Sequence, residues 1–139
     1  MSFREKSAWI TLVSVLACFG AYYGAVFAGV VRSHSMAAFH LGLASLLALI
    51  VLQVGLNLIA SMTTPKDGKG PRDEREKMIQ ARSHTIGYYT LMVSTAALFI
   101  PTHLRGFDMV DVVNFAFGGI VIATLAVAIA QIVMFRRGY

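Results

Sequence analysis

The sequence predicts an all-α integral membrane protein with four transmembrane helices. The 139-residue chain is 57% hydrophobic and only 14% charged, and its mean hydropathy is +0.68. Soluble domains usually carry about 25% charged residues. Asp, Glu, Lys and Arg are absent from four segments, residues 7–31, 33–65, 83–104 and 112–135, with 25, 33, 22 and 24 residues. Each segment exceeds the roughly 18–20 residues with which a helix crosses a bilayer.

We expect the four spans at about residues 8–31, 36–62, 83–103 and 110–135 of a single transmembrane domain that covers residues 1–139. The first span is too long for the apolar core of a signal peptide, so it is expected to stay in the protein. Short links join spans 1 and 2 and spans 3 and 4, which predicts antiparallel neighbours. Asp108 stands where it would cap the fourth helix, with Asp111 in its first turn.

The basic residues predict the orientation in the membrane. Ten of the twelve Lys and Arg residues precede span 1, lie between spans 2 and 3, or follow span 4, whereas Arg32 and Arg105 lie on the other side. The positive-inside rule then places both termini in the cytoplasm, giving an antiparallel four-helix bundle, N-in and C-in. The net charge of +5 therefore follows from topology, and we expect the lipid bilayer, and no nucleic acid, as a partner.

The segment 63–82 is expected to form a cytoplasmic loop followed by a helix. Residues 63–70 are rich in helix breakers, whereas Pro71 and the acids after it are typical of a helix start. No further Gly or Pro occurs before Gly87, within the third span. We therefore expect one long helix from about residue 71 to 100, which extends span 3 into the cytoplasm.

This segment also carries a resemblance. Asp73-Glu74-Arg75-Glu76, followed by Ile79, Arg82 and Tyr88-Tyr89, resembles a pattern in small bacterial four-span membrane proteins of unknown function, which have a D-E-R-[DE] motif before the third transmembrane helix. The similarity covers about seventeen residues and the four-span layout. It implies a multi-pass protein of the bacterial cytoplasmic (inner) membrane and supplies no activity.

The sequence lacks residues that several classes of membrane protein require. Apart from Asp111 in the first turn of span 4, no span contains a charged side chain, whereas proton relays and ion paths usually do. The small multidrug transporters need a carboxylate in the first span, and quinone-linked disulfide enzymes need a cysteine pair, but Cys18 is alone. Enzymatic activity is therefore not expected.

Histidines offer a weaker hypothesis. His40 and His103 would both lie near the outer surface, where they could face each other across spans 2 and 3 as haem ligands, or bind copper or zinc with His34 and Met36. Their spacing does not enforce convergence. Bonds to water and headgroups explain them more simply, so we predict no cofactor and no metal.

Two sets of residues inside the spans predict helix contacts. Gln53, Asn57 and Asn114 are polar, and are expected either to hydrogen-bond between helices or to line a polar path. Gly20, Gly24 and Gly29, with Ala25, form small-x-x-x-small patterns that allow close packing. This packing would be against span 2 or against a second copy.

Two functions remain open. The first is a non-enzymatic accessory or regulatory membrane protein, acting through protein contacts within a larger complex. Its partner- or lipid-contacting residues would be Arg72, Asp73, Glu74, Arg75 and Arg82. The alternative is a homo-oligomeric channel or carrier for a small solute. A membrane-embedded enzyme or a haem- or metal-binding protein is a distant third.

Overall fold

The computed structural model of the chain is all-α, as predicted. It describes residues 3–32, 34–63, 73–106 and 108–137, without the side chains of residues 101–105. The four helices are α1 (Phe3–Phe27), α2 (Met36–Thr63), α3 (Glu74–Arg105) and α4 (Met109–Arg137).

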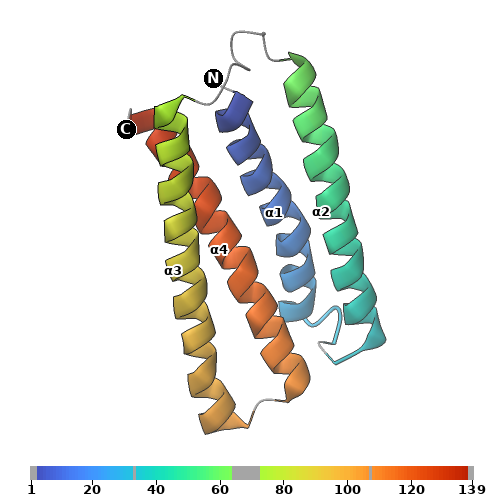
Figure 1. Cartoon of the computed structure of the whole chain (residues 1–139). Helices are drawn as coiled ribbons and strands as arrows, with labels where there is room; N and C mark the ends of the chain where they lie inside the picture. Colours follow the sequence, from blue (N-terminus) through green and yellow to red (C-terminus); the bar gives the residue numbers. More distant parts are fainter. Residues whose placement is uncertain (1–2, 33, 64–72, 107, 138–139) are drawn as a thin grey trace.

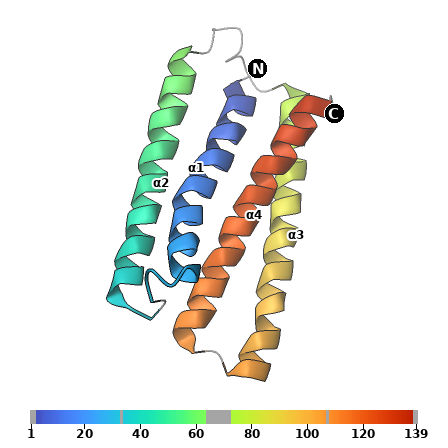
Figure 2. The ribbon, with the colours of Figure 1, turned by 180° about the vertical axis from the view of Figure 1, so that it is seen from behind.

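The helices lie side by side in the order α2, α1, α4, α3 (Figures 1 and 2). α1 packs against α2 and α4, and α4 also packs against α3, so α2 and α3 form the two edges. The first residues of α1 and α3 and the last residues of α2 and α4 lie at one end of the molecule, together with both termini (Figure 1). We call this the N/C end.

Three helices are long and apolar enough to cross a membrane: α1, α2 and α4. α3 is not among them, although its segment 83–104 carries no charge before Arg105. The reason is composition, because Ser, Thr, His and Tyr side chains occupy much of its first half and lower the hydropathy of any 18-residue window. The four-span prediction therefore holds for three helices by this criterion.

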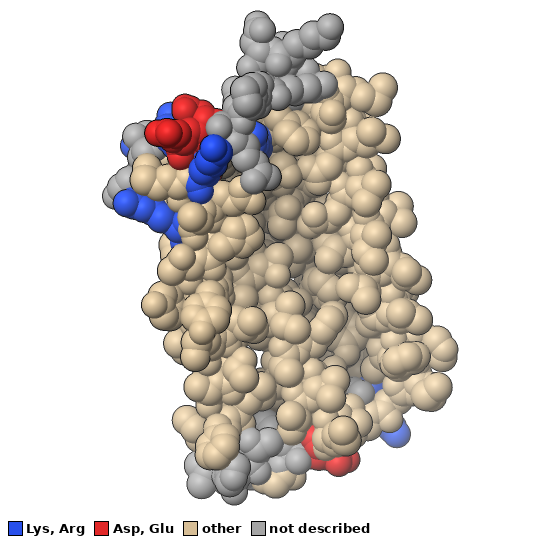
Figure 3. Space-filling model, viewed as in Figure 1, with Lys and Arg blue, Asp and Glu red and all other residues tan. Residues whose placement is uncertain are grey.

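α2 exposes apolar side chains around most of its circumference. Only Ala38, Ser45 and Ala60 are buried, whereas Val51 and Met62 are 71% and 77% exposed. A helix that is apolar on all sides is stable in lipid or inside a large protein, not in water. On the face shown in Figure 3, charged residues gather at the two ends of the molecule and leave an uncharged belt between them.

The closest helix contact joins α3 to α4 through small residues. A Cβ added at Gly87 of α3 would overlap the Val127 side chain of α4, and one added at Gly119 of α4 would lie 2.8 Å from Ser94 Oγ of α3. Ser83, one turn before Gly87, is fully buried. Small side chains on both helices thus let the two backbones approach.

The expected packing role of the α1 glycines is not seen within the chain. Gly20 and Gly24 are exposed, and an added Cβ would meet nothing within 4 Å at either position. Gly42 of α2 makes the close approach instead, since its Cβ would lie 3.3 Å from the Tyr22 ring. The prediction of an α1–α2 contact through Gly20 and Gly24 is therefore wrong, and the second-copy alternative stays a prediction.

The helix ends differ slightly from the expected spans. α1 stops at Phe27, before the predicted residue 31, and Gly29 lies in the following turn with φ +72°, where it has no packing role. Asp108 stands directly before α4 as expected, but its Oδ1 accepts from the N–H of the adjacent Met109 at 2.9 Å, whereas a capping box would use the N–H of Asp111. α3 runs unbroken from Glu74 to Arg105, which confirms one long helix. The predicted Pro71 start lies outside the described residues.

Replacing Gly87 by Leu tests the α3–α4 contact. The added side chain must displace Val127, and overpacking of this kind typically costs ~1–3 kcal/mol. We expect a lower thermal unfolding midpoint in detergent. Gly20→Leu is the matched control, because open space surrounds that position and Leu favours a helix more than Gly does. Equal destabilisation by both variants would contradict the observed packing.

Candidate functional site

Charged side chains at the N/C end join three helices. Arg4 of α1 forms an ion pair with Glu76 of α3. Glu5, which follows Arg4 in α1, forms a second ion pair with Arg136 of α4, in which Glu5 Oε1 lies 3.7 Å from Arg136 Nε. The side chains of Arg4 and Glu76 are only 30% and 22% exposed, so water screens this pair less than a surface pair. The first turn of α1 is therefore held to both α3 and α4.

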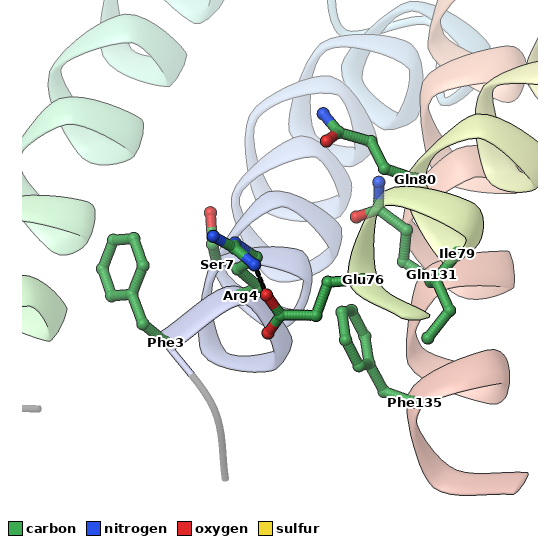
Figure 4. Close-up of a pocket in the computed structure, with 8 residues that line it drawn as sticks. All are labelled: Phe3, Arg4, Ser7, Glu76, Ile79, Gln80, Gln131 and Phe135. Atoms are coloured by element: carbon green, nitrogen blue, oxygen red, sulfur yellow. Dashed lines mark ion pairs between the residues drawn. The ribbon is translucent and has the colours of Figure 1, made fainter. Parts of the chain in front are cut away.

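A pocket of about 290 Å³ lies beside the Arg4–Glu76 pair. Arg4 and Glu76 point toward each other and meet at the pocket wall, and Gln80 and Gln131 lie next to each other in another part of the lining (Figure 4). The lining comes from α1, α3 and α4 and consists of Phe3, Arg4, Ser7, Glu76, Ile79, Gln80, Gln131 and Phe135. The pocket thus combines one cation, one anion, three neutral polar groups and three apolar side chains.

Trp9 lies on a neighbouring face of α1. The guanidinium carbon of Arg136 is 5.3 Å from its ring centre, which is within the range of a cation–π contact. The buried indole Nε1 has no hydrogen-bond partner in the described part of the chain. Trp9 and Glu5 together hold the last turn of α4 against α1.

Ser83 links α3 to α4 below the pocket. Gln131 Nε2 donates to Ser83 Oγ at 3.2 Å, and the Ser83 hydroxyl donates to the Gln80 carbonyl at 2.9 Å. One amide of the pocket wall is therefore fixed by a hydrogen bond between two helices.

The predicted partner-contacting residues that the structure describes are all exposed, on α3 or directly before it. Asp73, Glu74, Arg75 and Arg82 are exposed, as is Lys77 beside them, whereas Arg72 lies outside the described residues. Glu76, from the same charged motif, instead turns inward to Arg4. The motif therefore provides exposed side chains at Asp73, Glu74 and Arg75 and an ion-pair partner for α1 at Glu76.

The three polar residues predicted inside the spans do not converge. The Tyr22 hydroxyl donates to Asn114 Oδ1 at 2.9 Å, and the Tyr23 hydroxyl donates to the Asn114 carbonyl at 3.0 Å, which joins α1 to α4. Asn57 Nδ2 donates to the Gln53 carbonyl of its own helix at 2.8 Å. Asn114 thus makes the expected interhelical bond, whereas the amide of Asn57 bonds within α2.

The histidines lie apart in the described structure. His40 donates from Nδ1 to the Met36 carbonyl at 2.7 Å, and His34 Nε2 lies 3.9 and 3.7 Å from carboxylate oxygens of Asp108 and Asp111. The side chain of His103 lies outside the described residues, and its helix, α3, stands at the edge opposite to the α2 edge that carries His40. His40 and His103 therefore do not stand on helices that pack against each other, and no metal-binding group of three His, Cys, Asp or Glu side chains occurs among the described residues.

Comparison of the chain with protein-family models, curated proteins and solved structures gives no match. The functional interpretation therefore depends on the geometry above. Sequence reasoning missed Arg4, Glu5, Glu76 and Arg136 as a cluster. The signal was available, since the predicted topology places the first residues of α1 and the last of α4 at one end.

Replacing Asn114 by Leu tests the link between α1 and α4. The substitution leaves the buried Tyr22 hydroxyl without its acceptor, which costs about 1–2 kcal/mol. We expect a lower thermal midpoint in detergent. Asn57→Leu is the matched control, because the Asn57 amide bonds only to its own helix. A larger loss in Asn57→Leu than in Asn114→Leu would contradict the assigned roles.

Proposed function

We propose that this protein is an accessory or regulatory protein of the bacterial cytoplasmic membrane, which acts by binding another protein at the N/C end. The observation that carries the proposal is the sorting of charge on α3. Glu76 pairs with Arg4 between α3 and α1, where both side chains are partly buried, whereas Glu74, Lys77 and Arg82 extend from the exposed face of the same three turns. These exposed residues form the proposed docking face, together with Asp73 and Arg75.

Membrane insertion as an antiparallel bundle, N-in and C-in, is part of the proposal. It is supported by the three long apolar helices, by the exposed apolar surface of α2 and by the uncharged belt in Figure 3. The excess of Lys and Arg at the N/C end supports a cytoplasmic position for that end. The docking face would then stand just outside the bilayer.

A protein partner fits this face better than an anionic lipid surface does. Its charges alternate, with acids at Asp73 and Glu74 and bases at Arg75, Lys77 and Arg82. Lipid-binding segments instead gather about 4–8 basic residues without acids. A surface with both signs favours a partner with the complementary pattern, because wrong partners meet like charges.

The homo-oligomeric channel remains the second candidate. It is supported by the open glycine stripe of Gly20 and Gly24, which is available to a second copy. A channel would need polar side chains that line one path. Asn114 of α4 instead accepts hydrogen bonds from Tyr22 and Tyr23, and it lies on a different helix from Gln53 and Asn57. Solute flux into vesicles that contain only this protein, lost in Asn57→Leu, would favour the channel.

Single cysteines test the orientation. In a Cys18→Ser background, Thr63→Cys at the N/C end should react with a membrane-impermeant thiol reagent only after the inner membrane is permeabilised. Arg32→Cys, at the opposite end, should react from the periplasmic side in intact membranes. Both positions are exposed, so accessibility depends on the side of the membrane. Reaction of Thr63→Cys from outside would contradict the N-in orientation.

Charge reversal tests the docking face. The double variant Arg75→Glu and Arg82→Glu should abolish co-purification of a partner from native membranes, because like charges would then face each other. The wild-type complex should also weaken at high salt, since exposed charges are screened beyond about 8 Å at physiological ionic strength. Copurification is measured by mass spectrometry of affinity eluates. The control is Arg32→Glu, the same change on an exposed residue at the opposite end. A partner that is retained in the double variant would contradict the proposal.

A further inference from the structure

The pocket at the N/C end has a balanced set of charges. Arg4 supplies a guanidinium and Glu76 a carboxylate, and Ser7, Gln80 and Gln131 add groups that both donate and accept hydrogen bonds. Arg4 and Glu76 pair through one guanidinium nitrogen and one carboxylate oxygen, so further N–H groups of Arg4 and the second oxygen of Glu76 remain for a ligand, and the lining has no net charge. It suits a ligand that carries one positive and one negative group close together.

The position of the pocket narrows the class of ligand. Ser7 is the first residue of the uncharged run in α1, and Phe135 is the last residue of the uncharged run in α4. In an inserted protein this boundary lies at the level of the lipid headgroups. Phe3, Ile79 and Phe135 add an apolar wall, which suits the glycerol and first methylenes of a lipid.

We propose that this pocket binds the headgroup of a phospholipid that carries both a phosphate and a primary ammonium, an ethanolamine phospholipid. The phosphate would accept hydrogen bonds from Arg4 and from a glutamine NH₂ group, since a guanidinium matches phosphate geometry. The ammonium would donate to Glu76 and to an amide oxygen. The inference rests on the proposed membrane insertion and is independent of the protein partner.

The same chemistry discriminates against the other common headgroups. A choline headgroup has a cation without N–H donors, so Glu76 would gain no hydrogen bond from it. A glycerol headgroup has no cation, so its phosphate would bring an unbalanced negative charge toward Glu76. The pocket should therefore prefer ethanolamine over both.

Native mass spectrometry of the delipidated protein in detergent tests the proposal. The probes are dioleoyl phosphatidylethanolamine, phosphatidylcholine and phosphatidylglycerol, added together at equal concentration. We expect the protein to bind the ethanolamine lipid roughly tenfold more tightly than the other two, because the additional hydrogen bond to the charged Glu76 carboxylate favours that lipid by about this factor. Glu76→Gln should reduce the preference to about twofold or less. Glu74→Gln is the matched control, because it makes the same change on the exposed face of α3 and should keep the preference.

Each other outcome is decisive. Equal retention of the three lipids by the wild-type protein overturns the proposal even if Glu76→Gln fails to fold. An unchanged preference in Glu76→Gln overturns it as well. Soluble O-phosphoethanolamine has the same headgroup without the acyl chains, so it should displace the lipid only weakly. If it binds as tightly as the lipid does, the pocket belongs to a soluble ligand and the proposal is overturned. Membrane insertion is checked separately by recovery of the protein in the membrane fraction. A protein that is recovered there but shows no lipid preference contradicts the pocket assignment and not the insertion.

Discussion

Hydrogen bonds between polar side chains of different helices join the uncharged parts of this protein, and the helix arrangement depends on them. The Tyr22 hydroxyl and the Asn114 amide satisfy each other between α1 and α4, and Gln131 and Ser83 do so between α4 and α3. Several hydroxyl side chains instead bond to the preceding turn of their own helix, as Thr124 does to the Ile120 carbonyl. In a bilayer such bonds are favoured further, because the hydrocarbon region offers a polar group no alternative partner.

α1 has a central place in the packing. It alone contacts both α2 and α4 extensively, and it buries one face along its length, at Ala8, Ser14, Val15, Cys18, Phe19 and Tyr22. Its first turn adds the ion pairs of Arg4 with Glu76 and of Glu5 with Arg136. The geometry of the N/C pocket and of the adjacent face of α3 therefore depends on where α1 begins.

The two proposed interactions use opposite faces of the same three turns of α3. The inward face, with Glu76, Ile79 and Gln80, lines the pocket against α1 and α4. The outward face carries the exposed side chains of Glu74 and Arg82. A ligand that bound Arg4 and Glu76 together would join α1 to α3 and so fix the outward face in one position. A rigid docking surface binds its partner with a smaller entropic cost than a mobile one.

The sequence by itself determined the all-α class, the approximate helix bounds and the continuity of α3 through residue 83. These follow from long charge-free runs and from the absence of breakers between residues 72 and 86, both of which act locally. It also identified Asn114 as a residue suited to interhelical bonding, since a lone amide in an apolar helix needs a partner.

Only the tertiary structure decided which helix faces meet. The same small-residue pattern occurs in α1 and in α4, yet Gly20 lies open whereas Gly119 packs against Ser94, because the choice depends on the neighbouring helix surface. The edge positions of α2 and α3 separate His40 from the helix of His103. The partner of Glu76 was also decided there. Helical spacing favours an ion-pair partner for Glu76 four residues away in the same helix. The fold instead brings it into contact with Arg4, which precedes it by more than seventy residues.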